Sequence, residues 1–289
     1  MRLAFVHGIN NEDETEDTIK QKWWNALEQG WHAAGLPPKP QPDIAVAYYA
    51  DLLAGTTQSA AVEMGPSAAS TGLAVGLLQE YADAAGVRDH ELAATARDMG
   101  LPAEAVAQGI PHEGWIVSFA SVLERVLPTK GKLIARLFLS QAVTYINDKV
   151  LAAKIHEKVA SAIFDGRSDP IIIVAHSLGT VVSYRVLADE RFRLRDVPLF
   201  VTLGSPLSVR MFKPILPARG SIPEPPIGSW FNCRHKDDFV TLGRAINEQS
   251  IGFPGVLDST EVVGDDPDRH SIAQYLSSPA VARRIHDCL

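Results

Sequence analysis

PIIIVAHSLGTVVSY, residues 170–184, joins a short apolar run to a helical pattern through a turn of small residues. Four β-branched residues, Ile171 to Val174, are typical of a central parallel strand that is covered on both faces. The residues from Gly179 to Ala188 have the pattern of a helix. The segment therefore predicts a strand, a tight turn that carries Ser177, and a helix.

Further apolar runs on both sides of this segment indicate more strands. We expect strands at residues 3–6, 44–49, 199–203 and 230–234, with 261–263 as one more candidate. Helical patterns cover residues 15–34, a long segment from Leu133 to Ile163, and residues 271–288. Strands that alternate with helices predict an α/β fold, with a mostly parallel sheet and helices on both faces.

Residues 52–130 interrupt this alternation, because their apolar pattern is helical but loose and rich in alanine and glycine. We expect residues 1–51 and 131–289 to form the core, and residues 52–130 to form a helical insertion before the strand at 171–174. Such an insertion can be a lid that shapes a substrate pocket or a structural helical pad, and the sequence leaves both open.

Composition limits the kinds of partner. The formal net charge is -7 and no basic stripe is present, so a nucleic-acid partner is not expected. The most apolar window, residues 59–78, contains Glu63 and Pro66 and does not suit a transmembrane helix. The first residues lack a signal-peptide pattern, which favours a cytoplasmic protein, although a secreted chain without its leader would look the same. Cys233 and Cys288 suit free thiols better than a disulfide.

The turn around Ser177 suits nucleophilic chemistry. A serine hydroxyl attacks well only when it is exposed, oriented and paired with a base, and a sharp strand-to-helix turn provides exposure and orientation. Such a turn needs small residues two before and two after the serine, and here these are Ala175 and Gly179. The other interpretation is an ordinary turn in which Ser177 caps the helix.

Val174-Ala175-His176-Ser177-Leu178-Gly179 resembles the nucleophile elbow of α/β-hydrolase-fold lipases and esterases, although glycine is commoner than Ala175. The resemblance extends over most of the chain outside the insertion. It implies Ser177 as nucleophile, followed in the chain by an acid and then a histidine. It also implies that no cofactor and no metal ion are needed. His176, a frequent residue before the serine in this family, is expected to pack rather than act as the base.

Three histidines follow Ser177. The resemblance implies that the base lies in a late loop before the last helix, and His270 occupies that position. His286 lies inside the expected terminal helix and should pack there. His235 follows a strand and is separated by Lys236 from the acidic pair Asp237 and Asp238.

The acid that orients the base is expected among this acidic pair. In many related lipases the acid is followed by one residue and then valine. Asp238-Phe239-Val240 matches this spacing, so Asp238 is favoured and Asp237 stays open.

An oxyanion hole needs two N–H donors. One is expected from the backbone of Leu178, next to the nucleophile. The segment His7-Gly8-Ile9 resembles the His-Gly loop of lipases and esterases, which implies Ile9 as the second donor. The alternative is that His7-Gly8 only ends a strand.

These residues predict a carboxylic ester hydrolase that acts on a small-molecule or lipid ester through an acyl-enzyme intermediate. Ser177, Asp238 and His270 are the expected triad. The same residues suit a phospholipid acyl, thioester or amide bond, and a non-catalytic binding protein of the same fold is a further alternative. Asp265, Asp266 and Asp268 suit a solvated loop better than a calcium site. The sequence does not predict an oligomeric state.

Overall fold

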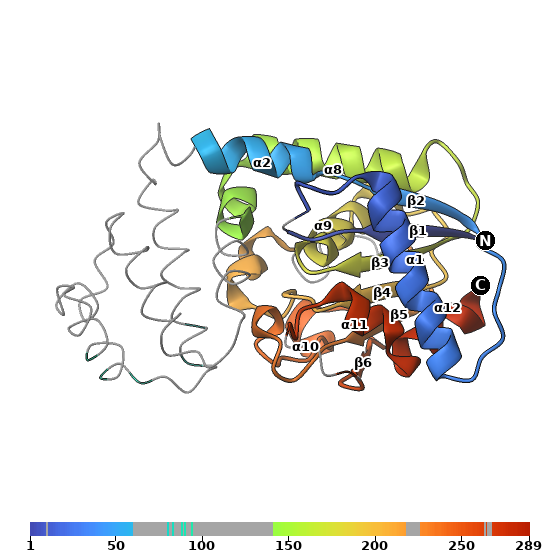
Figure 1. The fold of residues 1–289 in the computed structure, drawn as a ribbon. Helices are drawn as coiled ribbons and strands as arrows, with labels where there is room; N and C mark the ends of the chain where they lie inside the picture. Colours follow the sequence, from blue (N-terminus) through green and yellow to red (C-terminus); the bar gives the residue numbers. More distant parts are fainter. Residues whose placement is uncertain are drawn as a thin grey trace.

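The computed structural model describes residues 1–9, 11–59, 141–217, 226–262, 264 and 268–289, with isolated positions between 80 and 94. Within these residues six parallel strands form one sheet, as the sequence predicted for the fold class (Figure 1). The strands are β1 (Arg2–Val6), β2 (Asp43–Ala47), β3 (Ile171–His176), β4 (Phe200–Leu203), β5 (Trp230–Cys233) and β6 (Leu257–Ser259).

The spatial order of the strands is β2-β1-β3-β4-β5-β6. β1 pairs with β2 on one side and with β3 on the other, so the order reverses between β1 and β3. The connections that leave these two strands run to opposite faces of the sheet. In open parallel sheets, ligands bind at this point, in the crevice beyond the carboxyl ends of the strands. The strand order therefore favours a ligand-binding site beside Val6 and His176, at the carboxyl ends of β1 and β3.

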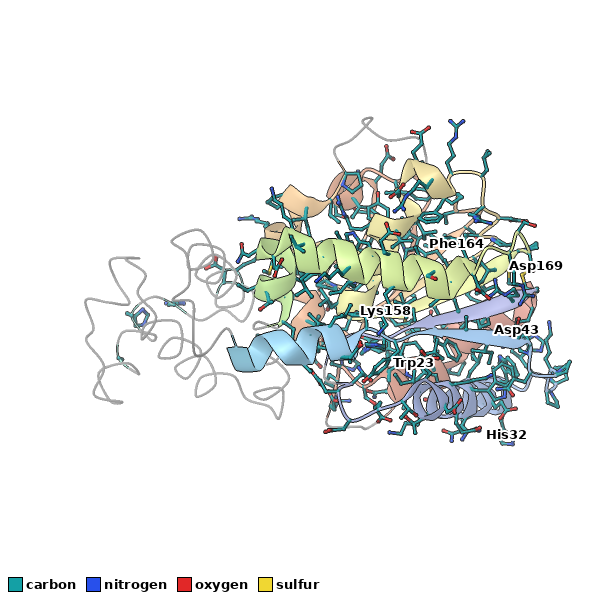
Figure 2. All side chains as sticks on the ribbon, turned by 90° about the horizontal axis from the view of Figure 1, so that it is seen from above. Trp23, His32, Asp43, Lys158, Phe164 and Asp169 are labelled. Carbon is teal, nitrogen blue, oxygen red and sulfur yellow. The ribbon has the colours of Figure 1, made fainter. Side chains whose placement is uncertain are left out.

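Helices cover both faces of the sheet (Figures 1 and 2). One face carries α1 (Glu16–Ala33), α11 (Ile272–Ser277) and α12 (Pro279–Cys288), and the other carries α2 (Ala50–Ser59), α8 (Lys149–Phe164) and α9 (Leu178–Leu187). Shorter helical elements are η1 (Glu190–Phe192), η2 (Arg210–Ile215), η3 (Phe239–Thr241) and α10 (Glu248–Ile251). Residues 141–147 are also helical.

Alternation of side chains along each strand divides the interior into two cores. In β1, Leu3 and Phe5 pack with the α1, α11 and α12 layer, whereas Ala4 and Val6 pack with the α8 and α9 layer. All four residues are fully buried. Both faces of the central strands are thus apolar, which is why they appear in the sequence as continuous hydrophobic runs.

The first helix begins and ends close to where the sequence predicted. Thr15 caps α1 through a reciprocal pair of hydrogen bonds with Thr18. The helix ends at Ala33, and Gly35 follows with a φ of 66°, a conformation that glycine adopts without a steric penalty. The three tryptophans of this helix, Trp23, Trp24 and Trp31, are buried and pack in the core.

Three expected elements were wrong in their boundaries. The last strand is Leu257–Ser259 and not residues 261–263, because Cys233 of β5 reaches only as far as Ser259. The expected helix 271–288 breaks at Ser278, which adopts an extended conformation because Pro279 follows it. The expected helix from 133 to 163 breaks at Asp148, whose side chain caps α8.

The predicted insertion, residues 52–130, lies mostly outside the described residues. Glu80 is one of its described positions, and its carboxylate is buried against the core. It accepts a hydrogen bond of 3.0 Å from the backbone N–H of Arg210 and forms an ion pair with Arg244. This contact ties Glu80 to the loops that follow β4 and β5.

Two further observations concern the chain as a whole. Cys233 is buried, Cys288 is half-buried, and both are free thiols, as the sequence favoured. Across the described ranges, none of the helices has the length and apolarity needed to cross a lipid bilayer.

Candidate active site

Ser177 lies in a strained turn between β3 and α9. Its backbone has a φ of 55° and a ψ of -132°. A residue with a side chain pays about 1 to 3 kcal/mol for such a conformation, and the surrounding contacts must compensate. The Ser177 N–H donates to the carbonyl oxygen of Leu203 at 3.0 Å, and the Thr180 hydroxyl donates to the Ser177 carbonyl oxygen at 2.7 Å. The turn is therefore anchored on both sides of the serine.

Close packing explains the glycines near this turn. A Cβ on Gly179 would come within 2.6 Å of the Val6 carbonyl oxygen, so the start of α9 packs directly against the end of β1. A Cβ on Gly8 would overlap the Cβ of Ser177 and lie 3.1 Å from its Oγ. The turn after β1 and the turn after β3 thus meet at Ser177, where the strand order reverses. The methyl group of Ala175 is accommodated in the core.

The structure brings His270 and Asp238 together at the carboxyl ends of the strands. His270 Nδ1 lies 2.8 Å from Asp238 Oδ2, and the Asp238 side chain is fully buried. The neighbouring Asp237 has a side chain that is 60% exposed and lies near Lys236. The geometry therefore favours Asp238 over Asp237 as the partner of the histidine. An ionised carboxylate only accepts hydrogen bonds, so His270 donates from Nδ1 and its Nε2 points away from Asp238.

Two atoms needed for acyl transfer have no partner within the described part of the chain. Ser177 Oγ and His270 Nε2 are both buried and make no hydrogen bond there. By contrast, the hydroxyl of Ser205, two residues after β4, is bonded to the Thr180 hydroxyl at 2.7 Å. A catalytic pair is often separated in the absence of substrate and closes when substrate binds. Neither atom is committed to another contact in the described chain, whereas Ser205 has a structural contact. Ser177 is fully buried, so the exposure expected of the nucleophile is not found in this structure.

The predicted oxyanion donors flank the serine. Ile9 follows Gly8, and Leu178 opens α9, where the first backbone N–H groups of a helix have no partner within the helix. In the described residues neither the Ile9 nor the Leu178 N–H donates to a protein acceptor. Within that part of the chain both N–H groups lack an acceptor, as an oxyanion donor requires.

His7 holds the loop that carries Ile9. Its Nε2 accepts the Tyr49 N–H at 3.0 Å, so its proton lies on Nδ1 and is donated to the Gly8 carbonyl oxygen at 2.7 Å. Burial lowers the pKa of His7 to about 4, which keeps the ring neutral at neutral pH. The Gly8–Ile9 peptide is thereby held in one orientation, which in turn sets the direction of the Ile9 N–H.

The other histidines have structural contacts. His176 Nε2 donates to the His270 carbonyl oxygen at 2.9 Å, and the two rings lie 4.4 Å apart, so His176 packs beneath the proposed base as expected. His286 Nε2 donates to the Pro37 carbonyl oxygen and its ring contacts Trp31. His235 Nδ1 accepts the N–H of Asp237 at 3.0 Å.

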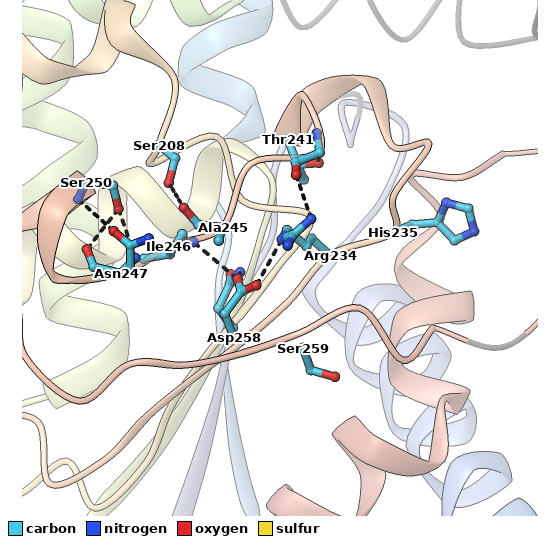
Figure 3. A network of polar contacts seen from close by, with 12 residues as sticks. Ser208, Arg234, His235, Thr241, Ala245, Ile246, Asn247, Ser250, Asp258 and Ser259 are labelled. Carbon is cyan, nitrogen blue, oxygen red and sulfur yellow. Dashed lines mark hydrogen bonds and ion pairs between the residues drawn. The ribbon is translucent and has the colours of Figure 1, made fainter. Parts of the chain in front are cut away.

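An ion pair fixes the two ends of the loop that carries Asp238 (Figure 3). Arg234 Nε lies 3.0 Å from Asp258 Oδ2 of β6, and its guanidinium also donates to the Gly243 carbonyl oxygen. Asp258 Oδ1 accepts from the Asn232 amide, so the same carboxylate joins β5 to β6. In Figure 3 the His235 ring lies apart from this network. The loop between residues 234 and 243 is therefore closed at both ends.

A cleft of about 650 Å³ opens beside His270. Its floor contains apolar side chains such as Trp23 and Ile272, and its rim contains polar ones such as Lys22 and Gln29. Ile9 and several residues of α1 also line it, whereas Ser177 does not. A ligand group attached near His270 can occupy it.

The acidic loop before His270 supports the histidine. Asp268 Oδ1 accepts the backbone N–H of His270 at 3.0 Å. Asp265 and Asp266 lie outside the described residues. Among the residues that are described, no cluster of three or more histidine, cysteine or acidic side chains could hold a metal ion.

Sequence reasoning missed one residue that contacts this site. Tyr275 of α11 donates its hydroxyl to Asp238 Oδ2 at 2.7 Å. No motif marks this tyrosine, because the contact depends on how α11 packs against the loop after β5.

Comparisons with protein-family models, with curated proteins and with solved structures each found no match. The functional reading of this site therefore rests on its geometry.

Proposed function

We propose that this chain is a serine hydrolase of the α/β-hydrolase type that cleaves carboxylic esters. The observation that carries the proposal is the convergence, at the reversal of strand order, of the strained Ser177 turn, the buried His270–Asp238 pair and the loop that holds Ile9. A serine in this backbone conformation is costly to maintain, and strain of this kind is concentrated at functional sites.

In the first half of the reaction, His270 Nε2 takes the proton from the Ser177 hydroxyl as Oγ attacks the ester carbonyl carbon. The carbonyl oxygen becomes negative and accepts hydrogen bonds from the N–H groups of Ile9 and Leu178. The imidazolium that forms is stabilised by Asp238. It then donates its proton to the alcohol oxygen, the ester bond breaks, and an acyl-serine remains.

In the second half, water replaces the alcohol. His270 takes a proton from the water as its oxygen attacks the acyl carbon, and the proton then passes to Ser177 Oγ as the acid leaves. The overall reaction consumes one water and returns every side chain to its initial state.

The cleft beside His270 indicates where the alcohol part of the ester lies. The leaving alcohol must receive its proton from His270 Nε2, so the group attached to that oxygen lies next to the histidine. Because His270 and Trp23 line the cleft, we assign the alcohol part of the ester to it.

A set of esters and one pair of variants test the proposal. p-Nitrophenyl esters of graded chain length, compared with matching thioesters, amides and a phospholipid, report which acyl bond is cleaved. Ser177→Ala should abolish hydrolysis while the circular dichroism spectrum stays unchanged. Ser183→Ala is the matched control, since Ser183 is also a buried serine of the described chain whose hydroxyl has no partner there. Retained hydrolysis by folded Ser177→Ala protein contradicts the proposal.

A non-catalytic binding protein would behave differently in the same assay. It would hydrolyse none of the substrates, and Ser177→Ala would leave ligand binding intact. The strained backbone of Ser177 next to the buried His270–Asp238 pair favours the hydrolase, because a binding protein has no need to maintain this costly turn.

A further inference from the structure

The Asp238 carboxylate receives three hydrogen bonds from three elements of the fold. Oδ1 accepts the Val240 N–H of η3 at 2.9 Å. Oδ2 accepts both the Tyr275 hydroxyl of α11 at 2.7 Å and His270 Nδ1 at 2.8 Å. The tyrosine and the histidine therefore share one oxygen, so any change in the tyrosine bond alters the bond to the proposed base.

A backbone amide determines the direction of the tyrosine proton. The His235 N–H donates to the Tyr275 hydroxyl oxygen at 2.8 Å, and an amide N–H can only donate. The one hydroxyl proton is thus left for Asp238. Burial and the negative charge of Asp238 raise the pKa of Tyr275 well above its ordinary value, which keeps this proton in place. Tyr275 is consequently a constant neutral donor to the carboxylate.

We propose that Tyr275 is a positioning residue that holds Asp238 and lowers the basicity of His270. This inference rests on the proposed function. A hydrogen bond to a carboxylate disperses its negative charge, and a carboxylate with dispersed charge stabilises an imidazolium less. The Tyr275 bond therefore keeps His270 unprotonated to a lower pH, where it can still act as a base.

The groups around His270 allow this effect to be isolated. Asp238 faces its Nδ1 from the loop after β5, and His176 of β3 lies beneath its ring. Asp268 contacts the backbone of His270, and Tyr275 approaches from α11 through the shared carboxylate. Tyr275→Phe removes the two hydrogen bonds of the Tyr275 hydroxyl, the one to Asp238 and the one from the His235 N–H, and leaves the ring in place.

The test is the pH profile of kcat/KM on a p-nitrophenyl ester. Tyr275→Phe should move the acid limb upwards by about 0.5 to 1 pH unit and lower kcat about tenfold, since one hydrogen bond to a charged group is lost. Tyr145→Phe is the matched control. Tyr145 is buried in the opposite layer, where its hydroxyl contacts His156 Nε2 at 2.6 Å, and its removal should leave the acid limb in place. An acid limb that Tyr275→Phe leaves unchanged or moves downwards overturns the inference.

A second substitution guards against misfolding, because Tyr275→Phe leaves the His235 N–H without its acceptor. 3-Fluorotyrosine at position 275 keeps the shape and the hydroxyl but makes the hydroxyl more acidic and a stronger donor. The acid limb should then move downwards, opposite to its movement in Tyr275→Phe. Labelling of Ser177 by a fluorophosphonate separates the two proposals: labelled protein with unshifted pH profiles refutes only the role of Tyr275, and folded protein without labelling or hydrolysis refutes the proposed function.

Discussion

Replacing Gly8 by alanine places a methyl group directly against the proposed nucleophile. Gly8 is not one of the described glycines with a positive φ, so its backbone accommodates alanine. The only obstacle is space, because the new Cβ would overlap the Cβ of Ser177 and lie 3.0 Å from the His176 carbonyl oxygen. Ser177 is anchored by Leu203 and Thr180, so the Gly8 loop is the part that must move.

The size of this movement sets the size of the effect. Non-bonded carbons rest at about 3.5 to 4.0 Å, so the loop must retreat by about 1 Å. Ile9 moves with it, and a retreat of this size takes its N–H out of hydrogen-bond range of the oxyanion. Loss of one oxyanion donor lowers kcat by about 10² to 10³-fold, or roughly 2.7 to 4 kcal/mol of transition-state stabilisation. The cost to folding is smaller, about 1 to 3 kcal/mol for overpacking.

Steady-state kinetics and thermal unfolding together measure this prediction. Gly30→Ala is the matched control, because its Cβ would lie 2.6 Å from the Leu276 carbonyl oxygen, where α1 packs on α11 and away from Ser177. Gly30→Ala should lower the melting temperature and leave kcat nearly unchanged. Folded Gly8→Ala protein with a kcat close to that of the wild type would refute the placement of Ile9 beside the oxyanion.

The remaining predictions concern the cleft, acid stability and the triad acid. Ala273 is exposed and lines the cleft, so Ala273→Trp should lower kcat/KM about tenfold for esters of bulky alcohols but not for methyl esters. The control Ala33→Trp, on the exposed surface of α1, should change kcat/KM for neither. An equal loss on both classes of ester would contradict the placement of the alcohol group in the cleft. Burial lowers the pKa of His156 from 6.5 to about 4. As the pH falls, the unfolded chain therefore takes up this proton before the folded chain does. The contribution of neutral His156 to the free energy of unfolding is complete above pH 6.5 and is lost towards pH 4. The free energy of unfolding, measured by urea denaturation, should fall less between about pH 7 and pH 5 in His156→Gln than in the wild type, by about 2 kcal/mol. The same fall in both proteins would argue against a neutral His156 ring in the folded state. Asp238→Asn should lower kcat roughly 10³ to 10⁴-fold while Asp237→Asn leaves it unchanged, and comparable effects of the two would reverse the choice of acid.

Local chemistry explains what the sequence could predict. The strand before Ser177, the turn and the following helix depend on residues that are neighbours in the chain, and the structure has them at β3 and α9. The pairing of His270 with Asp238 was expected from the resemblance to α/β-hydrolase-fold lipases and not from the residues alone, and the structure has the two side chains 2.8 Å apart. Pro279 could also have predicted the break at Ser278, because a residue before proline disfavours the helical conformation.

Contacts between distant segments explain what the sequence could not predict. β6 is a short edge strand of Leu257–Ser259 in which Leu257 is exposed and the other two side chains are half-buried, so it has no apolar run to mark it. Its position follows from pairing with β5 and from the Arg234–Asp258 ion pair. Tyr275 contacts Asp238 only because α11 and the loop after β5 meet in space. Neither contact is marked by a motif in the amino-acid sequence.

Fluorophosphonate labelling followed by peptide mapping tests the central claim most directly. The probe reacts with a serine only when that serine is activated by a base and its oxyanion is stabilised, which are the properties assigned to Ser177, His270 and the N–H groups of Ile9 and Leu178. We expect modification of Ser177 alone, and no modification of folded Ser177→Ala protein. Folded wild-type protein that stays unlabelled, or that is labelled at a residue other than Ser177, would contradict it.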